Sequence, residues 1–384
     1  MAQKSSKRQS SELHKTILMT MLAITAGFFG GWFGSQNTSL DSGDVTVTRE
    51  IVESEGNLIN TIATDVGPSV VSVNVTSTSF TQDFFGFGGR SFESESAGTG
   101  IILSDDGLII TNRHVLPSGL TNVSVTLDNG TELEAEVVGR TNDSDPLDIG
   151  FLKISDLQGE TLTPVKIGDS DNVVVGERVV AIGNALGRFQ NTVTSGIISG
   201  FGRDIEAFDG GGVETLQNLF QTDAAINSGN SGGPLVNSAS EVIGINVATA
   251  SAENISFAIP INDVKNLIDI VLEQGKLERA FLGIRYVPLN ETVAEQNELS
   301  STSGVYIPPS SQNRSSILSE SPAQKAGLQE EDIITQIDGQ DLNEENSLVS
   351  ILGQKRVGDV IELTVIRGEE TLSLFATLEA APES

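Results

Sequence analysis

The possible folds of this chain are limited most by a series of short apolar segments, separated by turn residues, between residues 65 and 260. Segments of this length that are rich in Val and Ile and bounded by Gly, Asn and Asp are typical of β-strands. They fall into two consecutive sets, which predict two β-barrels. The first set comprises residues 69–75, 100–103, 108–111, 123–127, 133–138 and 149–154. The second comprises residues 178–182, 192–200, 234–237, 242–247 and 255–259.

Two polar stretches interrupt these strands, and we expect both to be loops. Residues 80–97 are rich in Gly, Ser and Phe, and residues 203–215 contain three consecutive glycines. A helix is expected after the second set, because apolar residues recur there with helical spacing. Asn262 is suited to cap the start of this helix and Gly275 to end it.

The C-terminal residues have a different pattern, which predicts a separate α+β domain. Predicted strands alternate there with predicted helices near residues 322–326 and 344–353. The strands are expected at residues 282–287, 304–307, 332–337, 359–366 and 371–378.

The N-terminal segment combines a basic start with an apolar run. Four Lys or Arg residues occur in residues 1–15, and residues 17–34 carry no charge. A run of this length is about the minimum that crosses the hydrocarbon core of a membrane. Because basic residues stay on the cytoplasmic side, we expect a cytoplasmic tail over residues 1–15, a transmembrane helix over residues 16–35, and the remainder outside.

A signal peptide is the alternative interpretation of this segment. Ala23 and Ala26 resemble a cleavage site, although the apolar run continues past them. Residues 36–62 are polar and acidic, and we expect them to be a linker.

Charge and cysteine content argue against several classes of protein. The net charge of −30 argues against nucleic-acid binding, because phosphate recognition needs a basic surface. The chain has no cysteine, so disulfides, thiol catalysis and cysteine metal sites are excluded. We expect no metal and no cofactor. In a protein outside the cytoplasm, the lack of cysteine favours a bacterial source.

A nucleophile and a base can be identified from two separate motifs. Ser231 lies in the sequence Gly-Asn-Ser-Gly-Gly-Pro, where the glycines allow a tight turn that exposes its hydroxyl. The chain has only two histidines, and His114 is the one outside the N-terminal segment. Because a serine hydroxyl is a poor nucleophile until a base takes its proton, the imidazole of His114 is the predicted base.

An aspartate is needed to orient this imidazole, and three candidates lie between the two motifs. Asp143 and Asp145 lie in a polar turn, whereas Asp148 directly precedes the apolar strand at residues 149–154. We predict Asp148, since a carboxylate buried at the start of a strand holds an imidazole better. The N–H groups of Gly229 and Ser231 are predicted to form an oxyanion hole. The order His, Asp, Ser is that of a serine protease.

With these motifs, the chain resembles the HtrA/Deg-type serine proteases. The matching stretches include AGTGIILSDDGLIITNRHV, LDIGFLKI and QTDAAINSGNSGGPLVN. Further along, FLGI, SPAQKAGLQEEDIITQIDG and VGDVIELTVIR resemble a single PDZ domain. The resemblance implies a mostly β fold, with a chymotrypsin-like double β-barrel over residues 63–275 and an α+β PDZ domain over residues 278–380. One anchor and one PDZ domain are features of the membrane-tethered members.

The resemblance also implies partners and a location. We expect a homotrimer in a bacterial cell membrane, anchored by a single pass, with its catalytic part outside the cytoplasm and a role in protein quality control. Its partners would be unfolded or membrane protein substrates and C-terminal peptides. These peptides would bind to N–H groups of Leu282, Gly283 and Ile284, beside Leu348 on the neighbouring helix. Arg203 matches an arginine that relays the PDZ signal in related tethered enzymes.

The substrate pocket is expected to accept small apolar side chains. Ile226, together with Ile245 and Val247 on one strand, would line it, and Ala224 and Ala225 stand where a carboxylate would select Lys or Arg.

The predicted function is that of a serine endopeptidase, acting on misfolded or regulatory proteins outside the cytoplasm and regulated by peptide binding at the PDZ domain. Asn230 cannot form the ion pair that an aspartate before the nucleophile makes in trypsin-like zymogens, so activation by cleavage is not expected. One alternative is a dedicated regulatory protease for one membrane partner. Another is a peptide-binding or chaperone module with vestigial catalysis, against which the complete set His114, Asp148 and Ser231 argues.

Overall fold

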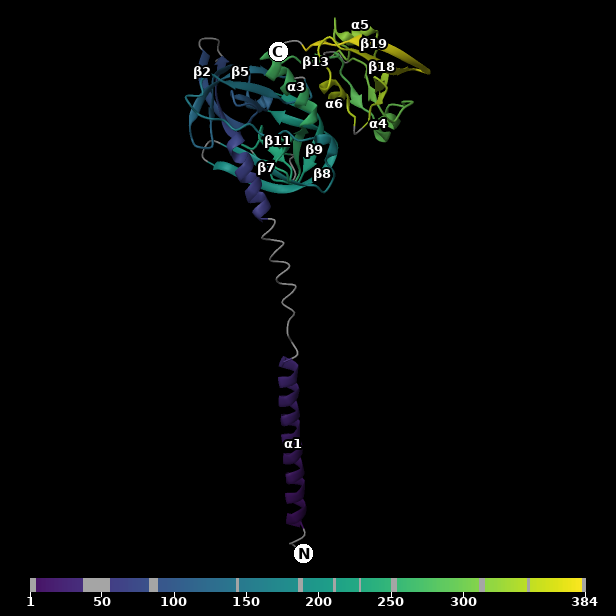
Figure 1. Ribbon diagram of the computed structural model, residues 1–384. Helices are drawn as coiled ribbons and strands as arrows, with labels where there is room; N and C mark the ends of the chain where they lie inside the picture. Colours follow the sequence, from purple (N-terminus) through teal and green to yellow (C-terminus); the bar gives the residue numbers. More distant parts are fainter. Residues whose placement is uncertain are drawn as a thin grey trace. The chain divides into compact units, whose positions relative to one another are not determined.

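The computed structural model describes ten stretches of the chain, residues 5–36, 56–82, 89–142, 145–185, 189–209, 212–227, 229–249, 254–310, 315–343 and 346–381. They belong to two compact units, Met1–Asn57 and Leu58–Ser384 (Figure 1).

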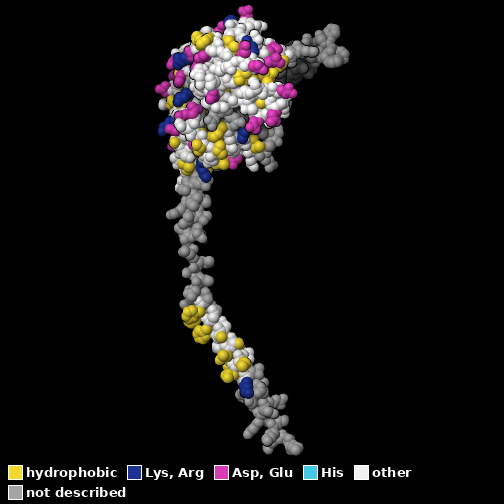
Figure 2. All heavy atoms as spheres, turned by 90° about the vertical axis from the view of Figure 1, so that its right-hand side faces the viewer, with side chains coloured by type: hydrophobic (Ala, Val, Ile, Leu, Met, Phe, Trp, Pro, Cys, Tyr) yellow, Lys and Arg dark blue, Asp and Glu magenta, His cyan; other side chains and the backbone are white. Residues whose placement is uncertain are grey.

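The first unit contains the helix α1, Ser5–Gln36. Large apolar side chains of this helix are exposed, among them Leu18, Met21, Phe28 and Phe33. Figure 2 shows such side chains in yellow along the helix. Within the part of the chain that the structure describes, no helix has both the length and the hydropathy of a membrane-crossing segment.

The first strands of the second unit close into a barrel in the order β1-β2-β3-β6-β5-β4. Val71, Val73 and Val75 alternate along β1 and are buried in its core, as expected for a strand with one interior face. The strands are β1 (Val70–Gln82), β2 (Gly89–Ile102), β3 (Leu108–Thr111), β4 (Leu120–Thr126), β5 (Glu132–Arg140) and β6 (Gly150–Ile154).

The next strands close a second barrel in the order β10-β11-β12-β9-β8-β7. One continuous apolar cluster joins the two barrels, with Ile110 and Phe151 from the first packed with Val180 and Ile182 from the second. The predicted double barrel is therefore confirmed. Its strands are β7 (Arg178–Ala185), β8 (Phe189–Asp209), β9 (Gly212–Thr222), β10 (Pro234–Val236), β11 (Val242–Thr249) and β12 (Ser256–Pro260).

Both stretches that were expected to be loops are mostly strand. β1 and β2 stay paired from Val70↔Ile101 to Gln82↔Gly89, and β8 and β9 pair as far as Asp209↔Gly212. The expectation was wrong because a long hairpin satisfies its backbone hydrogen bonds across strands, so polar and glycine-rich sequence does not end it. Residues 83–88 and 210–211 lie outside the described residues.

The compact unit begins earlier than the expected linker boundary at residue 62. Residues 56–66 form a helix. Ile62 and Val66 on this helix are buried in the cluster that joins the two barrels, with Leu58 and Ile59 packed against it. Apolar residues at this spacing line one face of a helix, which explains why residues 56–66 pack as a helix against the barrels.

The predicted helix after the barrels is α3, Asn262–Gln274, and it ends at Gly275 in the left-handed conformation, as expected. Asn262 does not cap it. The side chain of Asn262 instead donates to Asp169 Oδ1 at 2.7 Å and accepts from the N–H of Ser170 at 3.3 Å. A polar side chain that finds partners on a neighbouring loop, here the short helix η3 (Ser170–Asn172), is not available for its own helix.

The C-terminal part forms an α+β domain around its own apolar core, which includes Leu282, Ile334, Leu363 and Val365. Its main sheet has the order β14-β15-β16-β18-β19, with β17 paired to β16, and β13 pairs with β20. The strands are β13 (Ala280–Phe281), β14 (Val287–Pro288), β15 (Val305–Tyr306), β16 (Ile333–Ile337), β17 (Gln340–Asp341), β18 (Val360–Arg367), β19 (Glu370–Thr377) and β20 (Glu379–Ala380). The helices are α4 (Glu291–Gln296), α5 (Pro322–Ala326) and α6 (Leu348–Gly353).

A buried carboxylate lies where α3 meets β9 and α6. Asp263 is 2% exposed, and its Oδ2 accepts a hydrogen bond from Asn218 Nδ2 at 2.7 Å. Burial raises the pKa of Asp263 to about 6 from its ordinary value of 3.8, against the hydrogen bonds from Asn218 and Ser350, which lower it. As the pH rises from about 4 to about 6, the unfolded chain loses this proton before the folded chain does, so stability falls.

We therefore expect Asp263→Asn to stabilise the protein at pH 7.5 by up to about 3 kcal/mol, since asparagine keeps an acceptor for Asn218 and does not ionise. At pH 4 the variant and the wild type should unfold at similar temperatures. Thermal unfolding followed by circular dichroism across this pH range measures the difference. An equal gap at both pH values would contradict the assignment.

Candidate active site

Strand pairing places the candidate histidine and aspartate next to each other. β3 ends at Thr111, and the short helix η2 (Arg113–Val115), which carries His114, follows at once. Thr111 pairs with Gly150 at the start of β6, and Asp148 lies two residues before that start. The register of β3 against β6 therefore brings the two side chains together at one end of the first barrel.

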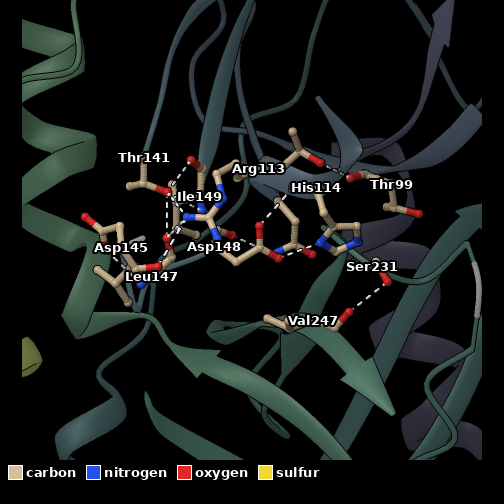
Figure 3. Close-up of polar contacts among 12 residues, drawn as sticks. Thr99, Arg113, His114, Thr141, Asp145, Leu147, Asp148, Ile149, Ser231 and Val247 are labelled. Carbon is tan, nitrogen blue, oxygen red and sulfur yellow. Dashed lines mark hydrogen bonds and ion pairs between the residues drawn. The ribbon is translucent and has the colours of Figure 1, made fainter. Parts of the chain in front are cut away.

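The geometry of the pair is that of an oriented imidazole. His114 Nδ1 lies 2.5 Å from Asp148 Oδ2, and the N–H of His114 donates to Asp148 Oδ1 at 2.9 Å (Figure 3). Asn112 Nδ2 holds the main-chain oxygen of Asp148 at 2.9 Å. The carboxylate is fully buried, whereas the imidazole is about 30% exposed. This arrangement keeps the proton on Nδ1 and leaves Nε2 to act as the base.

Asp148 stays ionised in spite of its burial. Burial acts to raise its pKa, but the charges of His114 and Arg113 and the hydrogen bonds from His114 outweigh burial and hold the pKa below its ordinary value. An ionised carboxylate is the form that stabilises an imidazolium.

Arg113 holds the segment that leads to this aspartate. Its side chain is 3% exposed, and Nη1 donates to Thr141 Oγ1 at 3.0 Å and to the carbonyl oxygens of Asn142 at 2.6 Å and Leu147 at 2.9 Å (Figure 3). A longer contact of 3.3 Å reaches the carbonyl oxygen of Asp145. The neighbours Asn112, Arg113 and His114 thus all bind the segment from 141 to 148.

The competing aspartate Asp145 contacts other groups. Its Oδ1 accepts from the N–H of Leu147 at 2.9 Å, and its Oδ2 forms an ion pair with Arg279. Both of these charged side chains are about 10% exposed. Asp145 therefore stabilises the segment before Asp148 instead of contacting the imidazole. Asp143 lies outside the described residues.

Ser231 lies in a turn that glycines make possible. Gly229 and Gly232 have positive φ angles of 109° and 83°. A Cβ atom on Gly232 would lie 2.1 Å from the carbonyl oxygen of Thr99, so no larger residue fits. The Ser231 hydroxyl donates to the carbonyl oxygen of Val247 at 2.9 Å (Figure 3). In this structure the hydroxyl is thus directed at β11.

Three backbone N–H groups of this turn are used internally. Those of Asn230, Gly232 and Gly233 donate to Asn227, Asn246 and Asn230, each at 2.9 Å. For Gly229 and Ser231, by contrast, no acceptor exists among the described residues. The side-chain hydroxyl of Thr99 holds the carbonyl oxygen of Gly229 at 2.5 Å, which orients this part of the turn.

The three residues predicted to line the substrate pocket do not form one cluster. Ile226 packs with Ala224 and other residues of the second barrel. Ile245 and Val247 belong to the cluster between the two barrels, and Ile245 is fully buried there.

The predicted peptide-binding residues do lie together in the C-terminal domain. Leu282 and Leu348 belong to its core and Ile284 packs against that core, and all of them, with Gly283, line one cavity. Arg203 lies within β8 and not in a loop, because β8 and β9 pair through this position. Its Nε donates to Gln221 Oε1 at 3.2 Å.

Sequence reasoning missed Arg113 and Thr99, although a signal for Arg113 was present. That signal is its position between the apolar strand at residues 108–111 and the predicted base, since an arginine that is buried there must be hydrogen-bonded. No cluster of three or more His, Asp or Glu side chains that could hold a metal ion occurs in the described ranges.

Both domains match known proteins. Residues 98–245 match the trypsin-like peptidase domain, and residues 280–378 match the PDZ domain. The chain is 36% identical over 337 residues to the serine protease Do-like HtrB of Bacillus subtilis (strain 168), covering 83% of this chain and 70% of that protein. It is 36% identical over 304 residues to the periplasmic serine endoprotease DegP of Salmonella typhimurium, covering 78% and 60% of the two chains.

Solved structures extend the likeness to the three-dimensional fold. The HtrA-type protease AlgW with a decapeptide is 30% identical, with a TM-score of 0.61, and the match covers 85% of this chain and 99% of that one. From the sequence relatives and these matching folds together, we conclude that the chain belongs to the HtrA family of Do-like serine proteases and is a serine endopeptidase with a trypsin-like peptidase domain and a PDZ domain.

Proposed function

We propose that His114, Asp148 and Ser231 are the catalytic triad of this endopeptidase. The observation that carries the proposal is the contact of 2.5 Å between His114 Nδ1 and the fully buried, ionised carboxylate of Asp148. A carboxylate in this position selects the imidazole tautomer whose Nε2 can take the proton of the serine hydroxyl.

In the proposed mechanism, the Ser231 hydroxyl leaves the carbonyl of Val247, rotates about its Cα–Cβ bond and donates to Nε2 of His114. Its oxygen then attacks the substrate carbonyl carbon as the proton passes to the imidazole. The N–H groups of Gly229 and Ser231 stabilise the oxygen of the tetrahedral intermediate. The imidazolium gives its proton to the leaving amine, and water releases the acyl group by the same steps.

A fluorophosphonate probe tests this assignment, since it reacts with an activated serine. The wild-type chain should be labelled at Ser231, and Ser231→Ala should not be labelled. Labelling that persists in the variant would place the nucleophile elsewhere, and an unlabelled wild type would favour a binding module with vestigial catalysis.

Arg113 is expected to position the triad, which gives a prediction of its own. In Arg113→Met the segment 141–147 loses its hydrogen bonds to the guanidinium, and a displaced Asp148 should lower kcat about 10²-fold with little change in KM. Arg113→Lys keeps the charge and should recover part of the rate. The control is Arg356→Met, since the Arg356 guanidinium donates to Glu273 Oε2 at 3.1 Å, away from this segment.

Proton NMR separates positioning from simple destabilisation. The short His114–Asp148 hydrogen bond should give a far-downfield imidazole proton, and its resonance should move in Arg113→Met and not in Arg356→Met. An unchanged resonance together with full activity would show that Arg113 has no part in positioning.

Ile226 and Val247 are the proposed surroundings of the substrate side chain at the cleaved bond, whereas Ile245 is fully buried between the two barrels and is not part of this proposal. The absence of a carboxylate at Ala224 and Ala225 supports cleavage after small apolar residues. Sequencing the products of an unfolded substrate tests this, because cuts mainly after Lys or Arg would contradict it. Activity in EDTA is expected to be unchanged.

The PDZ domain is proposed to bind C-terminal peptides and thereby control the protease. Leu282, Gly283, Ile284 and Leu348 would form the binding site, and the AlgW protease of similar fold was solved with a decapeptide. Arg203 is proposed to transmit the signal, because the adjacent residues Gly202 and Asp204 line a cavity with Tyr286 and Pro288 of the PDZ domain. A peptide with a free carboxylate should bind and change the cleavage rate, and its amidated form should bind much more weakly.

We propose a bacterial protein outside the cytoplasm, tethered by residues 16–35 and assembled as a homotrimer. Relatives that are named periplasmic support the location, and the basic residues before the uncharged run of residues 17–34 support the tether. The full chain should resist carbonate extraction from membranes, and sedimentation analysis should give three copies. A mature N-terminus near residue 35 would replace the anchor with a signal peptide.

A further inference from the structure

The PDZ segment of residues 283–289 is already hydrogen-bonded along one edge. The N–H of Arg285 donates to the carbonyl oxygen of Ser316 at 2.8 Å, and the N–H of Leu289 donates to the carbonyl oxygen of Gly304 at 2.9 Å. The carbonyl oxygen of Gly283 accepts from the N–H of Leu318 at 3.0 Å. Successive residues of a strand direct their N–H and C=O groups to opposite sides. The backbone groups of residues 284, 286 and 288 therefore face the other edge, which has no partner strand among the described residues.

This other edge borders an apolar groove beside α6. One cavity is lined by Leu282, Ile284 and Tyr286 from the strand and by Leu348 and Leu352 from the helix. An extended chain that lies in this groove can pair with the edge and place an apolar side chain between strand and helix.

The start of the strand is built to receive a carboxylate. The carbonyl of Leu282 accepts from the N–H of Ala323 at 2.8 Å, and the carbonyl of Gly283 accepts from Leu318. Since each peptide plane holds its N–H opposite its C=O, the N–H groups of Gly283 and Ile284 point away from these partners and toward the groove. Gly283 has a φ of 87°, and a Cβ there would lie 2.2 Å from Cβ of Ser321. Only glycine fits this position.

The far end of the edge lacks a donor. Consider a bound peptide whose C-terminal carboxylate lies at the N–H groups of Gly283 and Ile284. The third residue from its C-terminus then lies opposite Tyr286, and the fifth lies opposite residue 288. Tyr286 can offer both N–H and C=O, but residue 288 is Pro288, which has no N–H. The helix α6 forms the opposite wall of the groove. Because α6 begins at Leu348, this wall also ends near the position opposite Pro288.

Side chains of the protease domain close the same end. A cavity that includes Pro288 is lined also by Asp204, Gln217 and Asn218 of β8 and β9. The hydroxyl of Tyr286 donates to Gln217 Oε1 at 2.5 Å. A bound chain that continued past Tyr286 would meet these residues without gaining a complete pair of hydrogen bonds.

We propose that the PDZ domain reads only the last three residues of a C-terminal chain, with an apolar final residue and a free carboxylate, and that Pro288 sets this limit. The proposal rests on the peptide-binding function proposed above. It names the partner as a short exposed C-terminus and not an extended segment of four or more ordered residues.

Binding of peptides of increasing length tests the limit. The full chain carrying Ser231→Ala in detergent is titrated with N-acetylated peptides of three, five and seven residues that all end in Ala-Ala-Phe with a free carboxylate. The affinities should agree within about twofold. In Pro288→Ala, which supplies the missing N–H, the five-residue peptide should bind about two- to tenfold more tightly than the three-residue peptide. Pro309→Ala, an exposed proline outside the groove, should behave as the parent chain.

The outcomes separate this inference from the proposed function. Five- and seven-residue peptides that bind the parent chain more than about twofold more tightly than the tripeptide would overturn the three-residue limit while supporting peptide binding. No difference between the acid peptides and their amides, or no binding of any, would overturn the peptide-binding function itself. If Pro288→Ala does not fold, as circular dichroism would show, the length series in the parent chain still decides the limit.

Discussion

Replacing Ser231 or His114 with alanine is expected to lower kcat/KM by about 10⁴-fold or more while the fold is retained. Without Ser231 no nucleophile remains, and without His114 nothing takes the proton from the hydroxyl. Neither change should disturb the fold, because within the described residues the Ser231 side chain makes one hydrogen bond, to Val247, and the imidazole is partly exposed.

The measurement is cleavage of casein, with circular dichroism to confirm folding. The double variant should be no less active than either single variant, since the two residues act as one unit. Ser155→Ala replaces an exposed serine away from the site and serves as the control. Casein cleavage by Ser231→Ala at a rate near that of the wild type would refute the triad.

Asp148→Asn is expected to be nearly as severe, with a loss of about 10⁴-fold in kcat. The asparagine amide can donate to Nδ1, which would hold the imidazole in the tautomer whose Nε2 cannot accept a proton. The buried negative charge that stabilises the imidazolium is also lost. KM should change little, because Asp148 is fully buried and does not reach the substrate.

Asp145→Asn is the matched comparison, and it should affect stability more than catalysis. Its ion pair with Arg279 is about 90% buried, so the substitution leaves a buried guanidinium without its counter-charge. We expect a loss of about 1–4 kcal/mol in the free energy of unfolding and a kcat within about tenfold of wild type. Thermal unfolding and initial rates on the folded protein separate the two effects. A reversed ranking in kcat would move the acid of the triad to Asp145.

The order of the domains and the three candidate catalytic residues could be predicted from the sequence by itself, because both depend on short-range patterns. Strand periodicity and turn residues indicate barrels without knowledge of their pairing. Likewise, a serine in a glycine turn, one available histidine and an aspartate at a strand entry are recognisable one segment at a time. The comparisons confirmed the family, and the geometry of His114 and Asp148 supports this choice of residues.

Only the tertiary structure decided which distant residues meet. The long hairpin of β1 and β2, the partners of Arg113, the pairing of Asp145 with Arg279 and the side of the strand on which Pro288 lacks a donor all depend on strand register. Asn262 bonds to Asp169 and does not cap α3 for the same reason. Hydrogen bonds and ion pairs of this kind are formed by segments far apart in the chain, and their strength is set by burial, which a local pattern does not contain.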